Sequence, residues 1–156
     1  MCDFVDGVRV SVNRELQRGV GLTWAENLVL CRVAMAPDRR LRMVDIADLL
    51  GIAKSAVTKT VDRLERRGLV ARHRDPADQD RRIVYATLTD EGAEVFADAQ
   101  PIFVAAVTQH VAAPLTEVEL HQLGRISAKL LLARGQSQGD RNPRRRHSLS
   151  SGNTGP

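Results

Sequence analysis

The sequence predicts a mainly α-helical fold with a small β-hairpin wing, and three observations support this prediction. Apolar residues recur at helical spacing along most of the 156-residue chain. Aromatic residues make up only 3% of the chain, so Val, Leu and Ala must build the interior, which suits packed helices. By contrast, the runs "LVARHR" and "IVYATLT" have the composition of β-strands. The length is that of one compact domain.

Spacing and capping signals predict the first two helices. Residues 4–18 place apolar side chains at helical spacing and end before "RGVGL". In "TWAE", the Thr23 hydroxyl can accept a hydrogen bond from the third amide of a helix while Glu26 reaches back, which is a capping box. This box predicts a second helix that continues to about Ala34.

A short strand and a tightly connected pair of helices follow. The segment "RLR" is expected to be extended and leads into "MVDIADLLG", where Ile46, Leu49 and Leu50 form an apolar stripe. Gly51 then permits a tight turn, because glycine adopts the left-handed backbone conformation without strain. The next helix is predicted over residues 54–67 and ends at a second glycine.

The hairpin and two further helices complete the predicted order. The polar loop "DPADQDR" joins the two β-prone runs and predicts a hairpin with a charged tip. Thr89 can cap a long helix that contains Pro101 and is expected to bend there. A second capping box at residues 116–119 opens a last helix that is expected to reach about Arg134. Two helices with a tight turn, followed by a hairpin, are the winged helix-turn-helix arrangement.

Positive charge is concentrated in one part of the chain. The formal net charge is +4 at pH 7, and residues 53–82 carry nine basic against five acidic side chains. Residues 1–52 balance, whereas residues 83–134 are acidic overall. Localised positive charge is typical of nucleic-acid binding, although for "DRLERR" alone an ordinary solvated helix face is an equal alternative.

The predicted helix over residues 54–67 has a polar face suited to DNA. On a helical wheel, Val57, Val61 and Leu64 form a buried stripe, and polar side chains lie opposite. Short or flexible donors come first on the polar face and let the backbone approach base edges, while a later arginine can reach phosphates. These polar residues are Lys54, Ser55, Thr58, Lys59 and Arg63.

The hairpin tip offers a second DNA contact. Asp80 and Arg82 are two residues apart, so their side chains lie on one face of an extended segment and can pair. An arginine held at a hairpin tip suits a narrow minor groove, where the negative potential is concentrated. A solvated turn rich in charge is the alternative for this segment alone.

Several classes of function have no support in the sequence. No nucleophile with a neighbouring base, metal-ligand cluster or phosphate-binding glycine loop is visible, so we expect no enzyme and no cofactor. The N-terminus lacks the features of a signal peptide, and no stretch approaches the roughly 20 apolar residues of a membrane helix, so we expect a cytoplasmic protein. Cys31 is expected to be a small buried apolar residue, and redox activity of Cys2 is left open.

Residues 41–92 strongly resemble the DNA-binding core of MarR-type (multiple antibiotic resistance) bacterial transcriptional regulators. The matching pieces are "IADLLGI", "VTKTVDRLERRGLV", the pattern D-x-R at Asp80 and Arg82, and "LT-x-x-G" at residues 88–92. Each piece is weak alone, but this order and spacing are highly specific. The flanking helices also match the family layout, so the resemblance covers about residues 4–134.

The resemblance implies a homodimeric, ligand-responsive repressor that binds a pseudo-palindromic operator in double-stranded DNA. It divides the chain into the N-terminal helix of a dimerisation domain (1–22), a winged helix-turn-helix domain (23–92) and the C-terminal helices of the dimerisation domain (93–134). Residues 135–156 contain almost no apolar side chains, and this composition predicts a disordered basic tail. The implied dimer contacts are Phe96, Ile102, Phe103, Val107, Val111, Leu123, Ile126 and Leu130. A winged-helix protein-interaction module without specific DNA binding is the alternative.

The resemblance also assigns roles to single residues. Ser55, Thr58 and Lys59 would lie nearest the bases. Arg82 would occupy the minor groove, braced by Asp80, and Arg81 would contact phosphate. Many members of the family bind small anionic aromatic effectors between the dimerisation and DNA-binding regions. Candidates for such a cleft are Arg14, Arg18, Trp24 and His110, although a lone Trp after a capping Thr is more often a packing residue.

Overall fold

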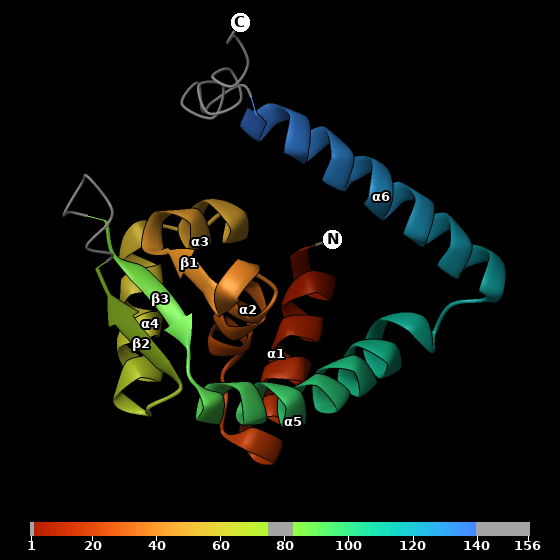
Figure 1. Cartoon of the computed structure of the whole chain (residues 1–156). Coiled ribbons are helices and arrows are strands. Elements are labelled where there is room, and N and C mark those ends of the chain that lie inside the picture. Colours follow the sequence, from red (N-terminus) through yellow and green to blue (C-terminus); the bar gives the residue numbers. More distant parts are fainter. Residues whose placement is uncertain (1, 75–82, 140–156) are drawn as a thin grey trace, which may run out of the picture. The chain divides into compact units, whose positions relative to one another are not determined.

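The computed structural model describes residues 2–74 and 83–139, which form the predicted mainly α-helical fold with a small β-sheet (Figure 1). The longer helices are α1 (Cys2–Val20), α2 (Trp24–Ala34), α3 (Met43–Leu50), α4 (Lys54–Arg66), α5 (Asp90–Val107) and α6 (Glu117–Gly139). The strands are β1 (Arg40–Arg42), β2 (Val70–His73) and β3 (Tyr85–Leu88), with short helical segments η1 (Pro37–Arg39) and η2 (Thr108–Ala112). The predicted element order is therefore confirmed.

The predicted helix starts are confirmed by hydrogen bonds at both capping boxes. At the start of α2, the Thr23 amide donates to Glu26 Oε2 at 2.8 Å and the Glu26 amide donates to Thr23 Oγ1 at 3.2 Å. Before α6, the Thr116 amide and hydroxyl donate to Glu119 Oε2 at 2.8 and 2.7 Å. These bonds lower the pKa of the Glu119 carboxyl, so their contribution to stability is lost as the pH falls through that lowered pKa.

The C-terminal end of the described chain differs from the prediction in one respect. Helix α5 is one long helix that contains Pro101, as predicted, whereas α6 ends at Gly139 rather than at about Arg134. The disorder expected from Gly135 is therefore wrong for residues 135–139, because glycine costs a helix only about 1 kcal/mol and does not by itself end it. The rest of the expected tail, residues 140–156, lies outside the described residues.

The sheet places the hairpin strands beside the helix pair. Its strand order is β1-β3-β2, and both pairings are antiparallel. Leu41 pairs with Ala86, and Val70 pairs with Leu88, which joins the short first strand to the hairpin. The turn between α3 and α4 uses Gly51 at φ 67°, which confirms the tight turn predicted there.

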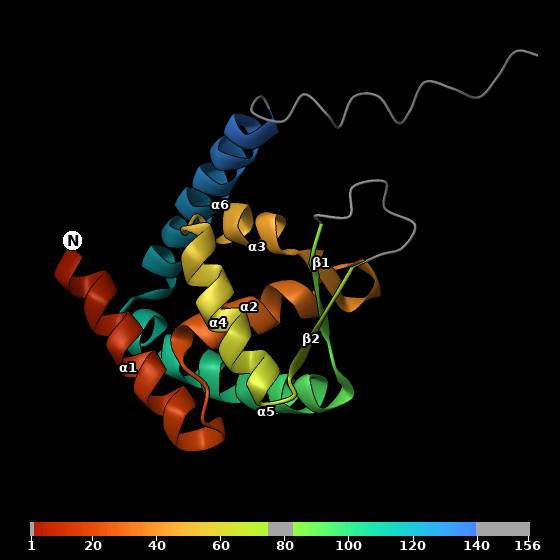
Figure 2. The same ribbon diagram turned by 90° about the vertical axis from the view of Figure 1, so that its left-hand side faces the viewer.

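One hydrophobic core holds these elements together within residues 2–74 and 83–111. Figure 2 shows α4 in front of α2, and α1 packs along α5. The largest fully buried side chains include residues of α1, α2, α3 and α4 and the residue just before β2: Leu16, Leu30, Ile46, Leu64 and Leu69. Because one face of α4 is fixed in this core, its opposite face is presented outward.

The chain divides into two compact units, residues 1–111 and 112–156. Helix α5 belongs to the first unit, where Phe96, Ile102, Phe103 and Val107 are partly buried against the core. Helix α6 belongs to the second unit and exposes large apolar side chains: Val118, Leu120, Leu123, Ile126, Leu130 and Leu132. In the described part of the chain, no helix is both long and apolar enough to cross a membrane.

Candidate nucleic-acid interface

Helix α4 has the two faces that the sequence predicts. Val57, Val61 and Leu64 have no exposed surface, and the Thr60 hydroxyl donates to the Ala56 carbonyl at 3.0 Å. The polar residues predicted to meet DNA are all exposed: Lys54, Ser55, Thr58, Lys59 and Arg63. The first turns of α4 thus present two ammonium groups and two hydroxyls to solvent.

One flank of α4 is held by Arg72 from strand β2. The Arg72 guanidinium forms an ion pair with Asp62, lies 3.3 Å from Glu65 Oε2 and donates to the Thr58 carbonyl oxygen at 3.0 Å. Its side chain is only 23% exposed, so these contacts are partly shielded from water. Arg72 therefore fixes the hairpin strand β2 to α4 and offsets part of the negative charge of these two carboxylates.

We expect Arg72→Ala to lower the free energy of unfolding by about 1–3 kcal/mol, because charge-assisted hydrogen bonds contribute about that much. Urea unfolding followed by circular dichroism measures the change. The matched control is Arg74→Ala, which removes the same charge from an exposed position just after the end of the same strand. Equal midpoints for the two variants would contradict the role of Arg72.

The other flank of α4 is held by Glu26 from helix α2. Its side chain is 5% exposed, and Oε1 lies 3.3 Å from Arg63 Nε. Oε2 takes part in the Thr23 capping box and lies 3.8 Å from Arg67 Nη1, which also donates to the Gly21 carbonyl at 2.9 Å. One buried carboxylate thus connects the start of α2 with Arg63 of α4 and with Arg67, the residue after the end of α4.

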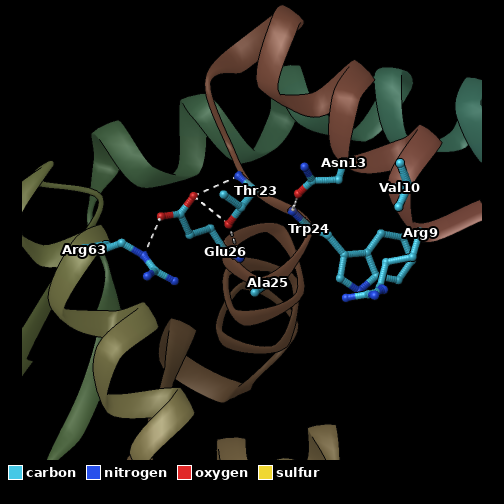
Figure 3. A pocket seen from close by; sticks show the side chains of 8 residues that line it. All are labelled: Arg9, Val10, Asn13, Thr23, Trp24, Ala25, Glu26 and Arg63. Atoms are coloured by element: carbon cyan, nitrogen blue, oxygen red, sulfur yellow. Dashed lines mark hydrogen bonds and ion pairs between the residues drawn. The ribbon is translucent and has the colours of Figure 1, made fainter. Parts of the chain in front are cut away.

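A cavity of about 480 Å³ opens beside this carboxylate (Figure 3). It is lined by Arg9, Val10, Asn13, Thr23, Trp24, Ala25, Glu26 and Arg63. Of the four residues predicted to line an effector cleft, only Trp24 lies here, and its ring is 5.6 Å from that of Phe103. Arg14 and Arg18 are exposed on α1, and His110 lies half-buried in η2.

A cluster of basic and aromatic side chains lies where the hairpin strands enter their connecting loop, at the pair His73–Tyr85. The Arg40 guanidinium lies 4.1 Å from the centre of the Tyr85 ring, and Arg42 Nε donates to the Tyr85 hydroxyl at 3.1 Å. His73 stacks on the same ring at 5.8 Å. Sequence reasoning missed this cluster, although the alternation of Arg40 and Arg42 on one strand face was a usable signal.

Three predicted DNA contacts at the hairpin tip, Asp80, Arg81 and Arg82, lie outside the described residues. Within residues 2–74 and 83–139, His, Cys, Asp and Glu form no group that is able to hold a metal ion. Cys31 is half-buried rather than buried, because its position on α2 is at the edge of the core, where its thiol lies 3.7 Å from Met35 Sδ.

Comparison with known proteins identifies proteins that are similar to this chain in sequence and in structure. Residues 20–82 match the model of the MarR family. The chain is 34% identical over 113 residues to the HTH-type transcriptional repressor MdtR of Bacillus subtilis, covering 72% of this chain and 70% of that protein. It is 35% identical to Sco3205 of Streptomyces coelicolor, a MarR family transcriptional regulator solved in complex with DNA, with a TM-score of 0.76 over 86% of this chain and 81% of that one. AbsC, a MarR family regulator of the same organism, is 27% identical, with a TM-score of 0.73 over 85% of this chain and 89% of that one.

Proposed function

This chain belongs to the MarR family of transcriptional regulators, and from this premise we propose that it is a ligand-responsive repressor that binds operator DNA as a homodimer. The exposed, donor-rich start of α4 is the observation that carries the proposal. A helix of this shape fits the major groove, and two copies related by two-fold symmetry would meet half-sites about one helical turn apart. Such a protein acts in the cytoplasm, where its operator lies.

The proposed DNA contacts follow the faces of α4 and the hairpin. Ser55, Thr58 and Lys59 face the bases, and the N-terminal end of α4 attracts phosphate because the helix dipole is positive there. Arg81 and Arg82 of the hairpin reach the backbone and the minor groove, with Asp80 bracing Arg82. A relative of known structure was solved with DNA, which supports this assignment for the fold.

The proposed dimer contacts come from the helices outside the winged region. Apolar side chains of α6 such as Leu123, Ile126 and Leu130 are exposed in a single chain, as expected if a second copy covers them. Those of α5, such as Phe96 and Phe103, pack partly against their own core and would contribute less. Repression itself is suggested by the relative MdtR, which is a transcriptional repressor.

The proposal is tested by salt-dependent binding of the chain to its own promoter fragment. For a dimer that neutralises phosphates, the logarithm of the binding constant falls linearly with the logarithm of the salt concentration, with a slope of about −0.9 per phosphate contacted. Light scattering of the same sample gives the number of chains in the complex. A chain that recognises proteins instead of DNA would show no salt-sensitive duplex binding even at low ionic strength.

Arg82→Ala is expected to weaken operator binding by about tenfold or more, since one arginine contact contributes about 1–3 kcal/mol and each dimer has two such residues. Arg82 lies outside the segments proposed to form the dimer, residues 1–22 and 93–134, so the dimer should survive. Fluorescence anisotropy with labelled operator measures the affinity, and light scattering checks the dimer. Unchanged affinity would refute the minor-groove assignment.

A small anionic aromatic effector is expected to bind in the cavity beside Trp24, stacking on its ring and facing the guanidinium groups of Arg9 and Arg63. Trp24 is the one tryptophan of the sequence, so binding should change its fluorescence. Titration with benzoate and salicylate measures the change, and cyclohexanecarboxylate is the control that lacks an aromatic ring. No response below millimolar concentrations would argue against this class of effector.

A further inference from the structure

The Glu26 carboxylate forms contacts with two elements, the start of α2 and helix α4. Oε2 accepts from the amide and hydroxyl of Thr23, both at 2.8 Å, and so caps α2. Oε1 faces the other way, toward Arg63 Nε at 3.3 Å (Figure 3). The side chain is 5% exposed, so water cannot replace either set of contacts at low cost.

These contacts hold one side of the Arg63 guanidinium in place, and its other side faces solvent. Nε is held by Glu26, and Nη2 lies 3.4 Å from the Thr60 hydroxyl. Among the described residues, Nη1 has no hydrogen-bond or ion-pair partner, and the side chain is 46% exposed. A guanidinium anchored through Nε while its outer donors face solvent is pre-organised to bind a phosphate oxygen.

We propose that Glu26 is a positioning residue for DNA binding, which acts by orienting Arg63 toward a backbone phosphate of the operator. The inference rests on the proposed function, because Arg63 must meet DNA for Glu26 to matter. Glu26 lies on α2 and is buried, so it does not touch DNA itself. Its positioning effect on affinity therefore passes through the Arg63 side chain.

A double-mutant cycle with Glu26→Gln and Arg63→Ala tests this inference. Glutamine at the third helical position also supports a capping box, so Glu26→Gln should preserve α2 while removing the charge that holds Arg63. Removing a negative charge near DNA favours binding by itself, but this contribution is present in both backgrounds and cancels in the cycle. The cycle therefore isolates the orientation of Arg63.

Glu26→Gln is expected to weaken operator binding about fivefold more in the parent than in the Arg63→Ala background. Arg63→Ala should also reduce the magnitude of the salt slope by about two for the dimer, because one phosphate contact per subunit is lost. Thermal melting of each variant separates folding from binding. Equal effects of Glu26→Gln in both backgrounds, or an unchanged affinity for Arg63→Ala, would overturn the inference.

A second variant keeps the test independent of the folding of Glu26→Gln. Arg63→Lys preserves the charge, but a single ammonium group cannot hold the carboxylate and a phosphate in the fixed geometry of a guanidinium. Its affinity should therefore fall nearly as far as that of Arg63→Ala, and parental affinity for Arg63→Lys would refute the proposal. If the parent binds no duplex even at low salt, the proposed function fails as well. If the parent binds and only the cycle shows no coupling, this inference fails alone.

Discussion

Lys59→Glu is expected to reduce operator affinity by about 100-fold or more while the chain still folds. Lys59 is exposed on α4, opposite the buried stripe, so the change does not disturb the core. A lost contact is worth about 1–3 kcal/mol, it occurs once in each subunit, and the new carboxylate also repels the phosphate backbone. Electrophoretic mobility shifts at several salt concentrations measure the loss.

The control for Lys59→Glu is Arg32→Glu, which makes the same change in net charge at an exposed position of α2, outside the proposed interface. A general loss of positive charge would weaken binding similarly in both variants. A specific contact would weaken binding only in Lys59→Glu. Similar losses in the two variants would show that α4 attracts DNA only through its overall charge.

The sequence predicted the elements of this fold well because their signals are local. The capping boxes at Thr23 and Thr116 lie within four consecutive residues, so side-chain chemistry alone indicates them. The buried stripe of α4 likewise follows from helical spacing. Gly51 was predicted for its turn because only the glycine backbone adopts such a φ without strain.

The contacts that hold α4 could not be predicted, because they join residues far apart in the sequence. Glu26 was recognised for its capping role, but nothing local indicates that its second oxygen faces Arg63, 37 residues later. Arg72 was seen only as part of a β-prone run, although its side chain contacts three residues of α4. Such pairs depend on how helices and strands pack, which the spacing of apolar residues does not determine.

The residues predicted to line an effector cleft show the same limit of prediction. Trp24 was chosen as an aromatic candidate and does line the cavity, but its predicted basic partners Arg14 and Arg18 are exposed elsewhere on α1. The arginine that α1 does place at the cavity is Arg9, one turn or more toward the N-terminus. The sequence indicated that α1 carries arginines, but their direction depends on the rotation of α1 against α2.

Gly92→Ala is expected to lower the free energy of unfolding by about 2 kcal/mol. A Cβ atom at this position would lie only 1.9 Å from the Leu69 carbonyl oxygen and 2.8 Å from its carbon, so backbone must move. Overpacking of this kind costs about 1–3 kcal/mol or more, and the better helix propensity of alanine returns about 1 kcal/mol. Thermal melting followed by circular dichroism measures the change.

Position 92 is sensitive to substitution because Gly92 lies where the start of α5 contacts the segment between α4 and β2. Its amide donates to Thr89 Oγ1 at 2.9 Å, and that hydroxyl donates to the Gly68 carbonyl at 2.7 Å, so the start of α5 is joined to the residues between α4 and β2. A displaced Leu69 would shift β2, and with it the Arg72 contacts to α4. We therefore expect Gly92→Ala to weaken operator binding even at temperatures where the variant is folded.

Alanine substitutions at two other glycines serve as controls for Gly92→Ala. Gly7→Ala adds a methyl group to exposed space on α1, with no atom within 4 Å, and should stabilise the helix slightly. Gly19→Ala brings Cβ to 2.3 Å from Ile102 Cδ1, which is the end of a flexible side chain that can rotate away, so it should cost less than Gly92→Ala. If Gly92→Ala melts like Gly7→Ala, the close approach of α5 to the Leu69 backbone does not limit what this position accepts, and the glycine of the "LT-x-x-G" pattern needs another explanation.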